Sequence, residues 1–130
     1  MGQYFILVNL NKKEYIDPFY IGSGAKFLEV CWNNVGKLLV YLLRKSDEVG
    51  GGDVEEPEKL QYCGRWAGDR IVLIGDYDKS KLYQKVKKNY KDIGIEAAKE
   101  YNRVIAMNES DFKFGKTTID DEGKILFIPF

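Results

Sequence analysis

The stretch YFILV at residues 4–8 is an uninterrupted apolar run close to the start of the chain. Aromatic and β-branched side chains favour extended backbone, and a run without polar alternation is typical of a strand that is covered on both faces. A second run of this kind is IVLI at residues 71–74. The two runs predict a sheet in which both segments are central strands.

Helical spacing of apolar residues predicts the elements that cover this sheet. Short helices are expected at Ala25–Trp32 and at Gly36–Lys45. Between Lys79 and Met107 the apolar residues recur every three or four positions, which marks one face of a helix. Gly94 interrupts that pattern, so we favour two helices that meet near residues 92–94, with one bent helix as the alternative.

The remaining segments complete a single domain. EYI at residues 14–16 predicts a short strand, and the C-terminal residues 116–119 and 124–128 predict a hairpin around an acidic turn. Residues 46–59 are rich in glycine and glutamate and predict a flexible loop. The expected fold of residues 1–130 is one α+β domain, with a mixed or antiparallel sheet and helices packed against it.

Composition excludes several classes of function. The chain has 130 residues, of which 45% are hydrophobic, and its formal net charge is zero. That balance argues against dedicated nucleic-acid binding and against polybasic membrane binding. The chain contains no histidine, which closes every mechanism that needs an imidazole base and every histidine-ligated metal site.

The sequence predicts a soluble protein of the cytoplasm. No signal peptide is visible, and the longest apolar stretch, Leu38–Leu43, is too short to span a bilayer. Cys31 and Cys63 have no metal-site spacing, so they are expected to be buried apolar residues, with one disulfide as the alternative. Frequent Lys, Glu, Ile and Tyr with scarce Gln and Met is typical of a thermophile protein.

The segment GRWAGDRIVLIGDYD at residues 64–78 holds the densest group of residues that can carry chemistry. Asp76 and Asp78 are two positions apart and point to the same side if the chain stays extended. With Asp53 from the glycine-rich loop they are candidate ligands for a divalent cation such as Mg²⁺ or Ca²⁺, which prefer oxygen. The alternative is an ordinary strand end whose aspartates form turns and cap a helix.

Two further groups are candidates for ligand recognition. Trp66 and Arg70, with Asp69 between them, could bind a partner, because arginine stacks on tryptophan and grips carboxylates or phosphates. The alternative is a core tryptophan with a salt-bridged arginine. Lys26 follows the turn Gly22-Ser23-Gly24, where backbone N–H groups at a helix start can hold an anion, although the spacing is not that of a phosphate-binding loop.

The sequences MGQYFILVNLNKKEYIDPFYIGSGAKFLE and GRWAGDRIVLIGDYD resemble a family of small proteins that share three features. These are a similar opening, a glycine-rich middle loop that ends in aspartate, and a W-A-G-D-R-I-V segment followed by G-D-Y. The resemblance covers about residues 2–82 and brings no assigned activity. It implies that the matching positions form either a shared site or a shared folding nucleus. Those positions are Asn9, Lys13, Glu14, Gly52, Asp53, Trp66, Asp69, Arg70, Gly75, Asp76 and Tyr77.

Three functions are compatible with these residues. The first is a small binding or interaction module whose surface includes Trp66, Arg70 and Asp53. The second is a metal-assisted hydrolase or transferase for a phosphorylated small molecule or nucleotide, with aspartate ligands and Arg70 or Lys26 on the phosphate. The third is a structural component of a homo-oligomeric assembly, which an uncovered edge of the terminal hairpin would favour.

Overall fold

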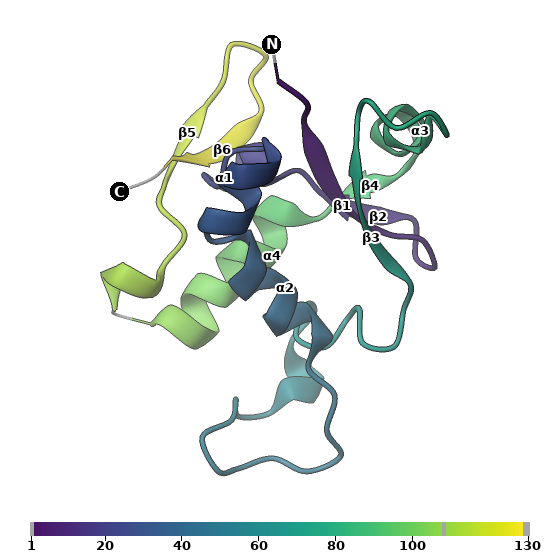
Figure 1. The fold of residues 1–130 in the computed structure, drawn as a ribbon. Coiled ribbons are helices and arrows are strands. Elements are labelled where there is room, and N and C mark those ends of the chain that lie inside the picture. Colours follow the sequence, from purple (N-terminus) through teal and green to yellow (C-terminus); the bar gives the residue numbers. More distant parts are fainter. Residues whose placement is uncertain (1, 108, 129–130) are drawn as a thin grey trace.

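The computed structural model describes residues 2–107 and 109–128, which form two small sheets and four α-helices. The first sheet contains β1 (Phe5–Asn9), β2 (Glu14–Ile16), β3 (Ile71–Gly75) and β4 (Lys91–Asp92), in the order β3-β1-β2-β4. β1 runs antiparallel to β2 and β3, whereas β2 and β4 are parallel. The predicted α+β fold with a mixed sheet is therefore confirmed (Figure 1).

The continuous apolar run of β1 is explained by helices on both faces of the sheet. Ile6 and Val8 belong to a cluster on one face with α3 (Leu82–Asn89). Leu7 belongs to the larger core on the other face, which includes residues of α2 (Val35–Leu43) and α4 (Gly94–Tyr101). Figure 1 shows α3 on one side of the sheet and α2 and α4 on the other. β1 is thus a central strand, as predicted.

β3 lies at the edge of the sheet, so the prediction that residues 71–74 form a central strand is wrong. Its partner is β1, and no other described strand pairs with it. Its first four side chains are half-buried. An apolar run indicates that both faces of a strand are covered, but it carries no information about the two hydrogen-bonding edges.

Two helices occupy residues 79–107, as predicted. α3 ends at Asn89, β4 follows, and α4 begins at Gly94 and continues into a π-helical turn. The Oδ1 atom of Asp92 accepts the backbone N–H of Gly94 at 2.9 Å, which closes the turn between the helices. A Cβ atom at Gly94 would lie 3.2 Å from Cγ2 of Ile16, so the glycine allows α4 to pack closely against β2.

The predicted terminal hairpin is confirmed as β5 (Lys116–Ile119) and β6 (Ile125–Ile128), which form a second, antiparallel sheet. One parallel bridge between Ile21 and Phe127 connects this hairpin to the segment that follows β2. The Phe127 side chain is buried in the larger core. The hairpin is therefore anchored through β6, whereas all four residues of β5 are exposed.

The cysteines differ from the prediction. Both are free, so the disulfide is not formed. Cys63 is partly buried, but Cys31 on α1 (Phe27–Trp32) is exposed, and the prediction of a buried side chain is wrong there. The reason is that α1 is short and buries only Val30. Among the described residues, no helix has the length and apolar character needed to cross a membrane.

Candidate functional site

The tryptophan of the W-A-G-D-R-I-V segment is a core residue. Trp66 is 0% exposed, and its Nε1–H donates to Oε1 of Glu14 at 2.9 Å. The same carboxylate accepts the Nε–H of Arg65 at 3.0 Å and the Nη2–H at 2.6 Å. Trp66 therefore offers no surface to a partner, and the interpretation as an exposed recognition residue is wrong. The arginine that accompanies it is Arg65, not Arg70, which is exposed.

Asp69 also has a structural role. Its Oδ2 atom accepts hydrogen bonds from Nδ2 of Asn9 at 2.8 Å and from Nζ of Lys12 at 2.6 Å. These two bonds hold the pKa of Asp69 below its ordinary value, and the bond from Asn9 has the larger effect. The backbone N–H of Arg70 donates to Oδ1 of Asn11. Together these contacts attach the segment before β3 to the turn between β1 and β2.

The candidate metal ligands do not converge. Asp53 forms an ion pair with Arg44, with Nη2 and Oδ2 2.5 Å apart, in the loop that follows α2. Asp76 accepts the backbone N–H of Tyr4 beyond the end of β3, and Asp78 bonds Ser80 in the turn before α3. In Figure 1 the loop 46–59 and the end of β3 lie at opposite ends of the molecule. Within the described ranges, no three side chains of the types that bind metals form a group.

Two carboxylates fasten the segment that precedes β3. Glu14 holds Arg65 and Trp66, and Glu100 of α4 accepts the backbone N–H groups of Gln61, Tyr62 and Cys63. Tyr77, by contrast, is exposed. This geometry gives Asn9, Glu14, Trp66 and Asp69 structural roles.

The hydrogen bonds and ion pair of Glu14 make the free energy of unfolding depend on pH. Burial raises the pKa of Glu14, but hydrogen bonds from Arg65 and Trp66, with the charge of Arg65, outweigh it and leave the pKa below its ordinary value of 4.5. Such a carboxylate stabilises the fold above the unfolded pKa, and this stabilisation is lost as the pH falls through the folded pKa. We expect the free energy of unfolding to fall below pH 4.5, and Glu14→Gln to show a smaller loss on acidification.

Urea unfolding at neutral and acidic pH measures this difference. Glu14→Gln should be less stable than the wild type at neutral pH and closer to it in acid. The matched control is Glu58→Gln, because Glu58 is exposed on a loop and should leave the acid dependence unchanged. An equal acid loss in the wild type and in Glu14→Gln would show that this network does not carry the pH dependence.

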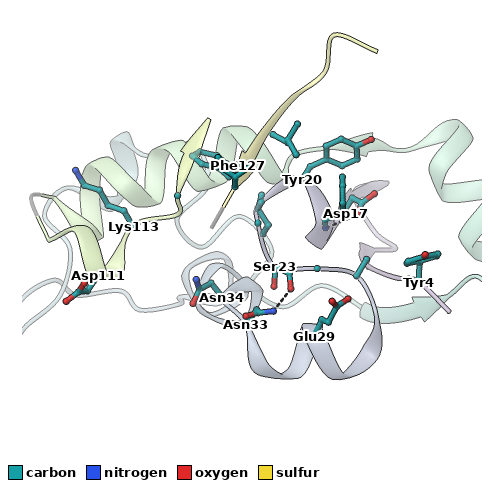
Figure 2. A pocket seen from close by; sticks show the side chains of 18 of the residues that line it. Tyr4, Asp17, Tyr20, Ser23, Glu29, Asn33, Asn34, Asp111, Lys113 and Phe127 are labelled. Carbon is teal, nitrogen blue, oxygen red and sulfur yellow. Dashed lines mark hydrogen bonds between the residues drawn. The ribbon is translucent and has the colours of Figure 1, made fainter. Parts of the chain in front are cut away.

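A cavity of about 1120 Å³ lies elsewhere, between the segment Asp17–Ala25, α1 and the terminal hairpin. This volume is slightly above the range of about 300–1,000 Å³ that is usual for small-molecule sites. Figure 2 shows side chains from these three regions around it, with Tyr20 and Phe127 on one side and Glu29, Asn33 and Asn34 on the other. The residues that line it include Tyr4, Asp17, Tyr20, Ser23, Glu29, Asn34, Tyr83, Asp111, Lys113, Leu126 and Phe127.

One wall is built by a segment whose backbone is fixed locally. Oδ1 of Asp17 accepts the N–H of Phe19 and begins a 3₁₀ turn at Pro18–Tyr20. Gly24 has a φ of +71°, and a Cβ atom there would lie 2.9 Å from the Glu29 side chain, so this position requires glycine. Nδ2 of Asn33 donates to the Ser23 carbonyl at 2.6 Å, which fastens the wall to the end of α1 (Figure 2).

The hairpin beside this wall is held in place by charged and aromatic contacts. Nζ of Lys124 lies 3.8 Å from the centroid of the Tyr20 ring and 3.2 Å from Oδ2 of Asp92. Both contacts join the hairpin turn to the body of the domain. On the sheet side of the cavity, Asp17 forms an ion pair with Lys87, with Oδ2 and Nζ 2.7 Å apart. Asp17 is therefore neutralised, and its charge is not available to a ligand.

The remaining charges make the cavity acidic. Glu29 and Asp111 line it, and neither forms an ion pair with any residue in the described ranges. Lys113 is the one basic residue among the lining side chains. The carboxylate of Glu29 accepts the backbone N–H of Lys26 at 3.1 Å, so a side chain of the protein already occupies the start of α1.

Lys26 does not form the anion site predicted from sequence. Its side chain lies beside Gly2, where a Cβ atom would meet Lys26 Cε at 2.6 Å, and it does not line the cavity. The turn Gly22-Ser23-Gly24, which precedes Lys26, does line the cavity. Sequence reasoning missed Glu29, Asp111 and Lys113. Glu29 lies far along the chain from Asp111 and Lys113, and nothing in the local sequence joins it to them.

Comparison with family models, with curated proteins and with solved structures finds no match to this chain. The candidate site is therefore defined by its own geometry. It is a cavity with aromatic and aliphatic walls, one lysine and three carboxylates, of which that of Asp17 is paired with Lys87.

Proposed function

We propose that this chain is a binding module that takes a small organic amine in the cavity between Asp17–Ala25, α1 and the hairpin. The observation that carries the proposal is the cavity itself, which combines enough volume for a ligand with both apolar and polar walls. The binding function was the first of the three expected from sequence. Its location is different, because Trp66 is buried and Asp53 is paired with Arg44.

The charges of the cavity favour a cationic ligand. The carboxylates of Glu29 and Asp111 can pair with an ammonium group, and the rings of Tyr4 and Tyr83 provide faces that attract a cation. A phosphate would instead meet these carboxylates without a basic cluster to offset them. In the described part of the chain, the candidate aspartates lie apart, and no group of metal-binding side chains supports the metal-assisted reaction.

The state of the cysteines supports a cytoplasmic protein and therefore a ligand from the cytoplasm. Both cysteines are free, and Cys31 is exposed, as suits a reducing compartment. We therefore place the proposed ligand among soluble cytoplasmic amines.

The proposal is tested with two ligands of the same shape and opposite charge. Tryptamine and indole-3-acetate share an indole ring and differ in carrying an ammonium or a carboxylate. Isothermal titration calorimetry should show tryptamine binding at least about tenfold more tightly, which corresponds to about 1.4 kcal/mol. Equal binding, or tighter binding of the carboxylate, would contradict the proposal.

Variants then assign the preference to the cavity. In the double variant Glu29→Gln with Asp111→Asn both charges are removed, while glutamine keeps an oxygen for the Lys26 N–H. The preference for tryptamine should disappear. The matched control is Glu55→Gln with Glu58→Gln, which removes the same charge from the exposed loop and should leave the preference intact.

A further inference from the structure

The outer edge of β5 is uncovered. In the described part of the chain β5 pairs only with β6, and its four residues are exposed. Proteins usually block such an edge with a proline, a bulge, a short strand or charged side chains; β5 is four residues long and carries one charge, that of Lys116. The strand reads Lys-Thr-Thr-Ile, and its pairing with β6 is regular at all four positions. Figure 1 shows the hairpin projecting from the rest of the domain.

The groups that face the open edge follow from the pairing inside the hairpin. The N–H of Asp120 donates to the carbonyl of Lys124 at 3.0 Å, which makes this a hydrogen-bonded pair. Such pairs alternate along an antiparallel ladder. Thr118 therefore bonds toward β6, whereas Thr117 and Ile119 direct their N–H and C=O groups outward.

These outward groups fit a second copy of the same strand. In an antiparallel pair, the side chains of opposite residues point to the same face of the sheet. A symmetric pair of β5 strands must therefore place one residue directly opposite the same residue of the second copy. With Thr118 opposite Thr118 of the second copy, Thr117 lies opposite Ile119 of that copy. Thr117 and Ile119 are the residues whose backbone N–H and C=O groups face the open edge. Each pair of Thr117 with Ile119 of the other copy can therefore exchange two backbone hydrogen bonds.

The same register pairs opposite charges. Lys116 lies opposite Asp120 of the second copy, in a position that forms no backbone bonds and therefore brings side chains closest together. Oδ1 of Asp120 accepts the N–H groups of Glu122 and Lys124, which leaves Oδ2 for the lysine. The strand thus begins with Lys116 and is followed by the acidic turn Asp120-Asp121-Glu122. An antiparallel pair places each basic end beside an acidic turn.

We propose that two copies of this chain associate through antiparallel pairing of β5, in the register centred on Thr118. The two hairpins then form one four-stranded sheet. The exposed side chains of Ile119 and Ile125, which are 66% and 42% exposed, lie on one face of that sheet. The contact is smaller than the roughly 800 Å² per partner of stable complexes, so the dimer is weak and concentration-dependent. This inference does not depend on the cavity.

Sedimentation velocity from micromolar to millimolar concentration tests the dimer. The wild type should change from monomer to dimer across this range. Thr117→Pro removes one outward N–H and no bond within the hairpin, so it should stay folded and monomeric. Lys116→Glu should weaken the dimer at least about tenfold by placing like charges opposite each other. Lys45→Glu, the same charge change on a distant exposed residue, should leave it unchanged.

Circular dichroism and the melting temperature establish that each variant is folded. If Thr117→Pro destabilises the hairpin, the comparison of Lys116→Glu with Lys45→Glu decides the question alone. A wild type that stays monomeric at every concentration overturns the proposal. A dimer that both hairpin variants leave intact overturns it as well, since the contact would then lie on another surface.

Discussion

Replacing Trp66 with alanine is expected to remove most of the stability of the fold. The Trp66 side chain is fully buried in the larger core and donates its indole N–H to Glu14. Truncation of a buried tryptophan costs about 3–5 kcal/mol, and a buried carboxylate then loses one donor. Small domains have only about 5–15 kcal/mol in total, so we expect a fall in melting temperature of at least about 10 °C.

The chain contains a matched control for this substitution. Its other tryptophan, Trp32, is 74% exposed at the end of α1. Trp32→Ala should change the free energy of unfolding by less than about 0.5 kcal/mol. Thermal and urea unfolding of both variants give the comparison. A stable, folded Trp66→Ala variant would contradict the assignment of Trp66 to the core and would reopen the interpretation as a recognition residue.

Replacing Glu100 with alanine should have the second largest effect. Its carboxylate is buried and accepts the backbone N–H groups of Gln61, Tyr62 and Cys63 and the hydroxyl of Tyr41. Removing it leaves these donors without their acceptor, and those of Tyr41 and Tyr62 are buried. Each such donor costs about 1–3 kcal/mol, and the whole change should cost about 3–5 kcal/mol.

The control for Glu100 lies one helical turn earlier. Glu96 of α4 is exposed and accepts a hydrogen bond from the Tyr62 hydroxyl. Glu96→Ala should cost no more than about 1 kcal/mol, because water can replace an exposed acceptor. Equal losses in the two variants, measured by urea unfolding, would contradict the account of Glu100 as the residue that fastens the segment before β3.

Much of the fold could be predicted from local patterns. Burial on two faces follows from the unbroken run YFILV at residues 4–8, and the division of residues 79–107 into two helices follows from Gly94. The edge position of β3 could not be predicted, because apolar composition describes the faces of a strand and not its neighbours. The exposed Cys31 was missed because helical spacing alone does not show that α1 buries a single side chain.

The site was harder to predict for a physical reason. Polar residues crowded around Trp66 suggested a ligand site, but the same crowding arises when a buried tryptophan and its neighbours must satisfy one another's hydrogen bonds. The turn Gly22-Ser23-Gly24 stands out by its glycines, but the sequence does not show that Glu29 fills the helix start that follows it. Asp111 and Lys113 reach the cavity only through the tertiary fold.

The central claim is that the binding site lies in the cavity and not around Trp66. The most direct test is a titration of ¹⁵N-labelled protein with tryptamine, followed by amide chemical shifts. We predict that the shifts that change belong to cavity residues such as Ser23, Gly24 and Asn34. Changes centred on residues 65–70 instead, or no changes at millimolar ligand, would contradict the claim.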